Sequence, residues 1–274
     1  MRSKPVAGRA LYWSEEDLRL KPYGKFWTRS MAPLPEVTRT ALHNGPVAEA
    51  LLPPLADVPT ALAEESSAIE NGFCFAADGS MRIAARTEMP GVTPEMVDWW
   101  FGWHSDSPER YKLWHPHAHV HAMWQSPPPE GSTGRARYVG NTSIVDEYLG
   151  SNLLRAAVRF VPPSQLGFAP SASDPARATI IAARTGLYEL PVDVGYLVHE
   201  VRRVAGGSVM RSRFWMGGSY VAGRSKLGSV LSAVAARLPA FGEADARALL
   251  VHDAQEMQHL VGILPGLYAE FGES

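Results

Sequence analysis

The order of strand-like and helix-like segments is the feature that most constrains the fold of this chain. Strand character dominates the middle, from about residue 72 to residue 216, whereas the last third is helical. The segment from Gly242 to Leu264 is rich in Ala, Leu, Met and Glu, and we expect one long helix there, ending near Pro265. Because strands and helices are segregated along the chain, we predict an α+β fold in which a long helix packs across an antiparallel sheet.

Turn and capping residues mark the boundaries within the middle of the chain. Two strands in residues 72–89 are expected to form a hairpin at Asp78-Gly79. Thr93-Pro94-Glu95 and Ser107-Pro108-Glu109 each combine a cap, a first-turn proline and an acidic residue, and so predict two helix starts. Further extended segments are expected at 135–160, 178–184, 195–204 and 208–216, and an amphipathic helix at 226–238.

The first 70 residues differ in character from the rest of the chain. They are irregular and rich in proline, with only a short helix expected near residues 59–68. We therefore expect residues 1–70 to be an extension packed on a main domain formed by residues 71–274.

Composition narrows the class of protein. The chain has 274 residues, a net charge of −2 and no long run of one sign, which argues against nucleic acid or an anionic membrane as a partner. Cys74 is the only cysteine, so an intrachain disulfide is excluded. The sequence has neither an apolar signal core near its start nor the ~18–20 apolar residues that span a bilayer, and we expect a cytoplasmic protein.

Four of the nine histidines stand close together at every second position: His115, His117, His119 and His121. Alternate side chains of a strand share a face, so a strand through this run would present a row of imidazoles. Neutral imidazole is a good ligand for zinc and similar ions. Pro116 interrupts the run, and the alternative is a strand that begins only near Ala118 and leaves His115 and His117 in a turn. Some of the four are then ordinary hydrogen-bonded histidines.

Distant residues can complete a metal site. His252 and Glu256 are four apart in the expected C-terminal helix and share a helix face with apolar neighbours, whereas His259 is expected to be exposed. One carboxylate of Asp146-Glu147 must point inward from an otherwise apolar strand pattern. His119, Glu147, His252 and Glu256 would together make a mixed nitrogen and oxygen site able to hold Zn²⁺.

Tryptophans surround the histidine run. The chain has eight, and five of them lie between residues 99 and 124. Aromatic residues at this density suit a pocket for a flat apolar ligand, although a large core is the more ordinary explanation for any single tryptophan.

These residues, in this order, resemble the 2,4-diacetylphloroglucinol hydrolase family, which includes phloretin hydrolase. The resemblance covers roughly residues 70–265. It rests on Trp99-Trp100, the segment from Glu109 to Pro116 with His119, Glu147 before Tyr148-Leu149-Gly150, the segment from Met210 to Trp215, and His252 with Glu256.

The resemblance implies a Bet v 1-like, helix-grip fold and zinc-dependent hydrolysis of the carbon–carbon bond between an acyl group and a polyhydroxylated aromatic ring. By position it implies His119, Glu147, His252 and Glu256 as zinc ligands. It also implies Tyr111 and His199 as catalytic residues of the pocket. Candidate substrate contacts are Tyr111, His115, Phe214 and Trp215.

The chain departs from the family pattern at two pocket positions. An asparagine expected three residues after the first ligand is Ala122, and a second phenol-binding tyrosine is missing near Phe214 and Trp215. These differences bear on the identity of the substrate. A small phenolic ketone is the expected partner, and a homodimer is left open. The alternatives are a helix-grip protein that binds polyphenols without chemistry, and a metal-dependent hydrolase of another ketone or an ester.

Overall fold

The computed structural model describes residues 10–226, 228–230 and 241–272. Its longer helices are α1 (Glu15–Leu20), α2 (Glu36–Asn44), α3 (Val58–Ala63), α4 (Pro94–Trp103), α5 (Pro108–Lys112), α6 (Arg135–Tyr138) and α8 (Glu243–Phe271). Its strands are β1 (Gly72–Phe75), β2 (Ser80–Pro90), β3 (His119–Trp124), β4 (Thr142–Leu149), β5 (Asn152–Val161), β6 (Ala178–Leu187), β7 (Val192–Val204), β8 (Gly207–Gly217) and β9 (Ala222–Gly223).

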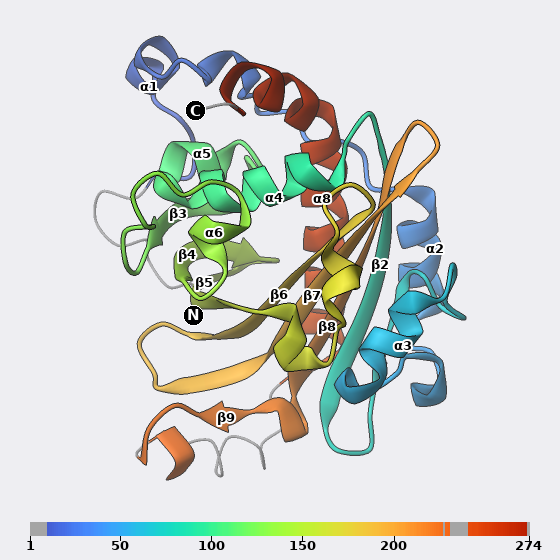
Figure 1. The fold of residues 1–274 in the computed structure, drawn as a ribbon. Coiled ribbons are helices and arrows are strands. Elements are labelled where there is room, and N and C mark those ends of the chain that lie inside the picture. Colours follow the sequence, from blue (N-terminus) through green and yellow to red (C-terminus); the bar gives the residue numbers. More distant parts are fainter. Residues whose placement is uncertain (1–9, 227, 231–240, 273–274) are drawn as a thin grey trace.

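The described strands form one sheet, in the order β1-β2-β8-β7-β6-β5-β4-β3, with β9 paired to β7. Every pair is antiparallel, and most neighbours in the sheet are also neighbours in sequence. Figure 1 shows the sheet wrapping around the long C-terminal helix α8, with α4 to α6 grouped near β3 to β5. The predicted α+β architecture, an antiparallel sheet with a long helix across it, is confirmed.

The N-terminal half of α8 packs on the part of the sheet formed by β1, β2 and β8. Ala246 and Leu250 lie in one buried cluster with Phe73, Ile83 and Phe214. Alternation along the strands directs these side chains to one face of the sheet. This packing fixes the position of α8 relative to the sheet, and so determines where the side chains further along the helix lie.

The second half of α8 continues through Pro265 to Phe271, so the predicted end near Pro265 is wrong. A proline inside a helix removes one hydrogen bond and costs roughly 3 kcal/mol. The residues beyond it bury enough apolar surface to offset this cost. Leu267 is fully buried, the Tyr268 ring lies 5.5 Å from Trp99, and the Phe271 ring lies 6.1 Å from Trp103.

The predicted starts of α4 and α5 are confirmed by their caps. The Thr93 hydroxyl accepts a hydrogen bond from the Met96 amide at 3.3 Å, and the Ser107 hydroxyl accepts one from the Arg110 amide at 3.3 Å. The two helices carry five aromatic residues of the largest core cluster, among which Trp100 is completely buried. The aromatic side chains of α4 and α5 pack together beside the start of β3, and we call them the aromatic wall.

The other predicted elements are mostly found. Both hairpins are present, turning at Gly79 and Gly206, each with positive φ. Residues 135–138 form the short helix α6 and not the expected extended structure, because the Tyr138 ring is buried and its hydroxyl donates to Asp98 at 2.6 Å. The helix expected at 226–238 falls mostly outside the described residues. Within the described ranges, every helix is too short or too polar to cross a lipid bilayer.

The segment between α2 and β1 lies against the outer face of the sheet, where side chains of β2 and β8 donate hydrogen bonds to it. These are Arg82 to the Leu52 carbonyl (2.9 Å), Arg211 to the Glu64 carbonyl (2.9 Å), Arg213 to the Ser67 hydroxyl (3.0 Å) and Trp215 to the Pro53 carbonyl (3.0 Å). The contacts explain why a proline-rich segment with few helical turns is held in place.

Arg211 also pairs with Glu200 across β7 and β8, with both side chains at most 5% exposed. Arg211→Ala leaves the Glu200 carboxylate buried without this partner, and we expect a loss of about 3 kcal/mol of unfolding free energy. Arg86→Ala breaks the exposed pair with Glu88 and is expected to cost less than about 1 kcal/mol. Urea unfolding of both variants checks the difference, and equal losses would contradict it.

Candidate metal centre and ligand pocket

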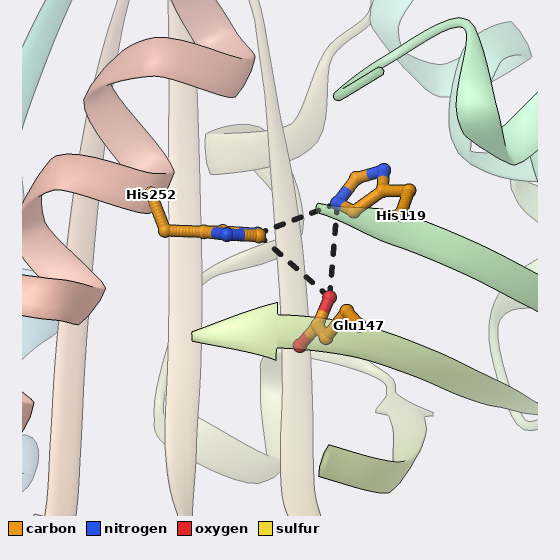
Figure 2. Close-up of side chains that lie close together, drawn as sticks. All are labelled: His119, Glu147 and His252. Carbon is orange, nitrogen blue, oxygen red and sulfur yellow. Dashed lines mark hydrogen bonds and ion pairs between the residues drawn. The ribbon is translucent and has the colours of Figure 1, made fainter. Parts of the chain in front are cut away.

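Side chains from three separate elements meet at the edge of the aromatic wall. His119 begins β3, Glu147 lies near the end of β4, and His252 and Glu256 lie one turn apart on α8. Figure 2 shows the first three of them pointing toward a common centre. The four are buried or nearly so, and His119 is inaccessible to solvent.

The distances between donor atoms are short. His119 Nε2 lies 3.3 Å from His252 Nε2, and Glu256 Oε2 lies 3.3 Å and 3.5 Å from these two nitrogens. Glu147 Oε2 lies 3.7 Å from His119 Nε2 and 3.8 Å from His252 Nε2. Ligands about 2.0–2.1 Å from a tetrahedral zinc ion are separated by about 3.3–3.4 Å. His119, Glu147 and His252 therefore form a group that could hold a divalent cation, and Glu256 lies close to both of its imidazoles.

The backbone orients the His119 ring for this role. His119 Nδ1 lies 3.0 Å from the Tyr111 carbonyl, so the protonated Nδ1 can donate to it and leave Nε2 as the free acceptor. A hydrogen bond of this kind on the outer nitrogen is the usual support of a metal-binding histidine. The parallel stack of the Tyr111 and His119 rings, at 3.7 Å and 3°, restricts rotation further.

The pKa values of the two clustered histidines shift in opposite directions. Burial and the neighbouring His252 hold the pKa of His119 well below its ordinary value. Burial opposes a charge on His252, yet Glu256 and Glu147 raise the pKa of His252 to about 9. Burial raises the pKa of Glu256. Two acidic groups that share a buried space with two imidazoles need a cation, and a metal ion supplies one without protonating the ligands.

Tyr111 joins the cluster to the pocket. Its hydroxyl donates a hydrogen bond to Glu147 Oε2 at 2.5 Å. Burial and the charge of Glu147 raise the pKa of this phenol well above its ordinary value, so it remains a hydrogen-bond donor at neutral pH. A donor beside the centre is suited to hold an oxygen atom of a bound ligand.

A small cavity of about 90 Å³ opens beside the cluster, and we name it the inner chamber. Rings make up much of its wall, and the polar groups that reach it include Glu147, Glu256 and Ser143. The aromatic lining consists of Phe101, His104, Tyr111, Trp114, Phe160, His199, Phe214 and His252. A flat aromatic ligand is the shape and chemistry that such a space accepts.

His199 belongs to β7 and lines the inner chamber. Its Nδ1 lies 2.8 Å from the Ser212 hydroxyl and 4.0 Å from Asp253 Oδ1. Burial lowers the pKa of His199 to about 3, so the ring is neutral. With Nδ1 engaged by Ser212, Nε2 is the nitrogen left for a ligand.

The histidine run does not form a row, and the alternative is found: β3 begins at His119, which leaves His115 and His117 in the turn before it. The register of β3 against β4 shifts between His119 and His121, which places them differently on the strand. His117 is exposed and its Nε2 lies 2.6 Å from the Arg29 carbonyl, while His115 is buried in the turn before the strand. The expectation that His259 is exposed is wrong, because α8 continues and His259 is only 7% exposed.

The structure brings most of the predicted site residues together, with two exceptions among the substrate contacts. His115 stacks on the His252 ring at 4.8 Å but does not line the inner chamber. Trp215 follows Phe214 in β8 and therefore points to the opposite face, where its indole donates to Pro53. Phe214 does line the chamber. Glu147 is the inward carboxylate of its pair, and Asp146 lies 3.3 Å from Arg155.

Sequence reasoning missed three residues of this region. His104 lines the chamber, with its Nδ1 2.9 Å from the Trp100 carbonyl, and Ser212 contacts His199. Asp253 is fully buried, and burial together with Glu256 raises its pKa to about 8. His104 directly follows the tryptophan-rich helix α4, and this position in the sequence could have marked it as a pocket residue. No sequence pattern marks Ser212 or Asp253, because their burial depends on how β8 and α8 pack.

The fold and the cluster define an α+β protein in which a sheet and a long C-terminal helix enclose a cluster of two histidines and two glutamates beside a ring-lined chamber. The family model described as the DAPG hydrolase PhiG domain matches residues 51–269, and this chain belongs to that family of hydrolases. A 2,4-diacetylphloroglucinol hydrolase of Pseudomonas sp is 33% identical, with 93% of this chain and 90% of the relative covered. A phloretin hydrolase of Eubacterium ramulus is 30% identical, with 93% and 92% covered.

The expected antiparallel sheet and long C-terminal helix are both present. Solved structures that resemble this arrangement include ginseng major latex-like protein 151 from Panax ginseng, with a TM-score of 0.33, 12% identity and coverage of 63% of this chain and 97% of that one. Another is Ara h 8.0201, with a TM-score of 0.32, 14% identity and coverage of 66% and 98%.

Proposed function

We propose that this chain is a zinc-dependent hydrolase of acylphloroglucinols. It would cleave the carbon–carbon bond between the acyl carbon and a polyhydroxylated aromatic ring, releasing a carboxylic acid and the deacylated phenol. The observation that carries the proposal is the meeting of His119, Glu147, His252 and Glu256 beside a ring-lined chamber. The names of the relatives, 2,4-diacetylphloroglucinol hydrolase and phloretin hydrolase, support the choice of substrate class.

The substrate itself explains how such a bond can break. Loss of an acyl group from an ordinary aryl ketone would leave an aryl carbanion. Hydroxyls ortho and para to the acyl group allow the ring to adopt a keto tautomer, in which the acyl carbonyl is part of a β-diketone. The hydroxyl of water is added to the acyl carbon, the bonding electrons return to the ring, and the ring carbon takes a proton. A zinc ion in the cluster would supply a water of lowered pKa and polarise the acyl carbonyl.

Tyr111 and His199 would bind the aromatic ring of the substrate. The Tyr111 hydroxyl, which now donates to Glu147, is placed to hold a ring oxygen beside the centre. His199 is neutral and lines the same chamber, so its free nitrogen can accept from a ring hydroxyl or move the proton that the ring carbon requires. The buried rings of Phe101 and Trp114 give this space an apolar wall.

Metal removal and replacement test the proposal directly. Purified protein is expected to contain about one zinc per chain and to release acetate from 2,4-diacetylphloroglucinol or the arylpropanoic acid from phloretin. Dialysis against a chelator should abolish turnover and lower the melting temperature, because an ion that binds only the folded state stabilises it. Added Zn²⁺ should restore both. Turnover that survives complete metal removal would refute the zinc assignment, and an absence of turnover by the metal-loaded protein would refute the substrate class.

A further inference from the structure

A second cavity joins the inner chamber and has a different lining. It has a volume of about 440 Å³, and we name it the outer chamber. The two chambers share Glu147, Val158, Leu197, Phe214 and Leu249, so they adjoin at Glu147, one of the four cluster residues. A ligand beside Glu147 therefore has space on both sides.

Aliphatic side chains dominate the outer chamber. Examples from five strands are Met81, Leu149, Leu154, Ala156, Leu187 and Val194. Among the described residues that line it, only Glu147 and Asp245 carry charge, and Asn152 and Thr185 are the neutral residues with polar side chains. No histidine, tyrosine or tryptophan reaches it, in contrast to the inner chamber. A space of this size and lining binds an apolar group without directional hydrogen bonds.

The difference between the chambers orients the substrate. A hydroxylated ring needs hydrogen-bonding partners, and Tyr111 and His199 provide them only in the inner chamber. With the ring there and the acyl carbonyl at the cluster, the rest of the acyl group must continue past Phe214 and Leu197 into the outer chamber. An acetyl group would fill almost none of this volume.

Resting on the proposed hydrolase function, we propose that the outer chamber is a binding site for the acyl arm, and that the preferred substrates carry apolar acyl groups of several carbons. Each buried methylene is expected to raise kcat/KM about fourfold until the chamber is filled. Specificity would then be set by β5 and its neighbours, on the side of the cluster opposite to the ring.

The test is a series of phloroglucinols with acetyl, butanoyl, hexanoyl and 3-phenylpropanoyl groups. The expected result is a kcat/KM at least about tenfold higher for hexanoyl than for acetyl. A preference for acetyl, or equal values across the series, would overturn the proposal while leaving the hydrolase function intact.

Variants on β5 locate the effect. Ala156 and Leu154 line the outer but not the inner chamber, whereas Leu153 lines neither, as strand alternation requires. Ala156→Phe should lower the hexanoyl-to-acetyl ratio of kcat/KM about tenfold, and Leu154→Ala should shift the optimum to a longer chain. Leu153→Ala is the matched control and should leave the ratio within twofold of the unmodified protein, about the scatter expected of a change outside the pocket. Equal ratios in the Ala156→Phe and Leu153→Ala variants would refute the site.

A binding measurement separates failure of this proposal from failure of the proposed function. Alkyl ethers of phloroglucinol cannot be cleaved at the ring carbon, and their affinity for the metal-loaded protein can be measured by calorimetry. Affinity that rises with chain length and falls in Ala156→Phe supports the chamber even if no ketone is hydrolysed. Affinity independent of chain length contradicts it even if acetyl substrates turn over.

Discussion

His252→Ala is expected to abolish both zinc binding and hydrolysis. His252 Nε2 lies within 3.8 Å of donor atoms of His119, Glu147 and Glu256, so the substitution removes a ligand that is close to all three others. The remaining imidazole and two carboxylates can hold zinc only weakly, and we expect kcat/KM to fall by on the order of 10³ or more. Elemental analysis and the acid-release assay measure the two effects on the same sample.

The matched control is His117→Ala, which removes an exposed histidine from the same region without touching the cluster. It should retain one zinc per chain and nearly full activity. Full zinc content in His252→Ala would remove His252 from the ligand set. A loss of zinc in both variants would instead indicate that the histidine run binds the metal.

Tyr111→Phe is expected to separate substrate positioning from metal binding. The change removes only the hydroxyl that donates to Glu147, and the stack of the ring on His119 can remain. Loss of one donor to an oxygen whose charge grows during the reaction typically costs 10²–10³ in rate, so we expect kcat/KM to fall by about 10². Zinc content should stay near one per chain.

Two measurements show whether this interpretation holds. The pH dependence of zinc binding in Tyr111→Phe should change little if the hydroxyl acts on the substrate. If the variant loses zinc along with activity, the main role of Tyr111 is to orient Glu147 and not to hold the ring. Full activity of the variant would exclude both roles.

Local sequence signals were sufficient for most of the secondary structure. Thr93 and Ser107 cap their helices, and Gly79 and Gly206 occupy turns with positive φ, so short-range chemistry determined these boundaries. The C-terminal end of α8 could not be found in this way. Proline is unfavourable inside a helix, and only the burial of Leu267 and the ring contacts of Tyr268 and Phe271 allow the helix to continue.

The candidate site divides in the same manner. The shared helix face of His252 and Glu256 could be predicted, and so could the inward position of one carboxylate of Asp146-Glu147, because helix and strand periodicity decide which side chains share a face. The distribution of the four clustered histidines could not, since a register shift between His119 and His121 breaks the period. The adjacent residues Phe214 and Trp215 of β8 were both expected to contact substrate. Phe214 does line the chamber, but Trp215 is buried on the opposite face of the sheet.

By itself the sequence determined the α+β class, the caps and turns, and the kinds of donor atoms available for a metal. Those properties follow from the chemistry and spacing of residues close together in the chain. Only the tertiary structure decided that His119 and His252, 133 positions apart, approach to 3.3 Å, that Asp253 is fully buried, and that an aliphatic chamber adjoins the centre. These depend on how α8 packs across the sheet, and packing is a property of surfaces brought together from the whole chain.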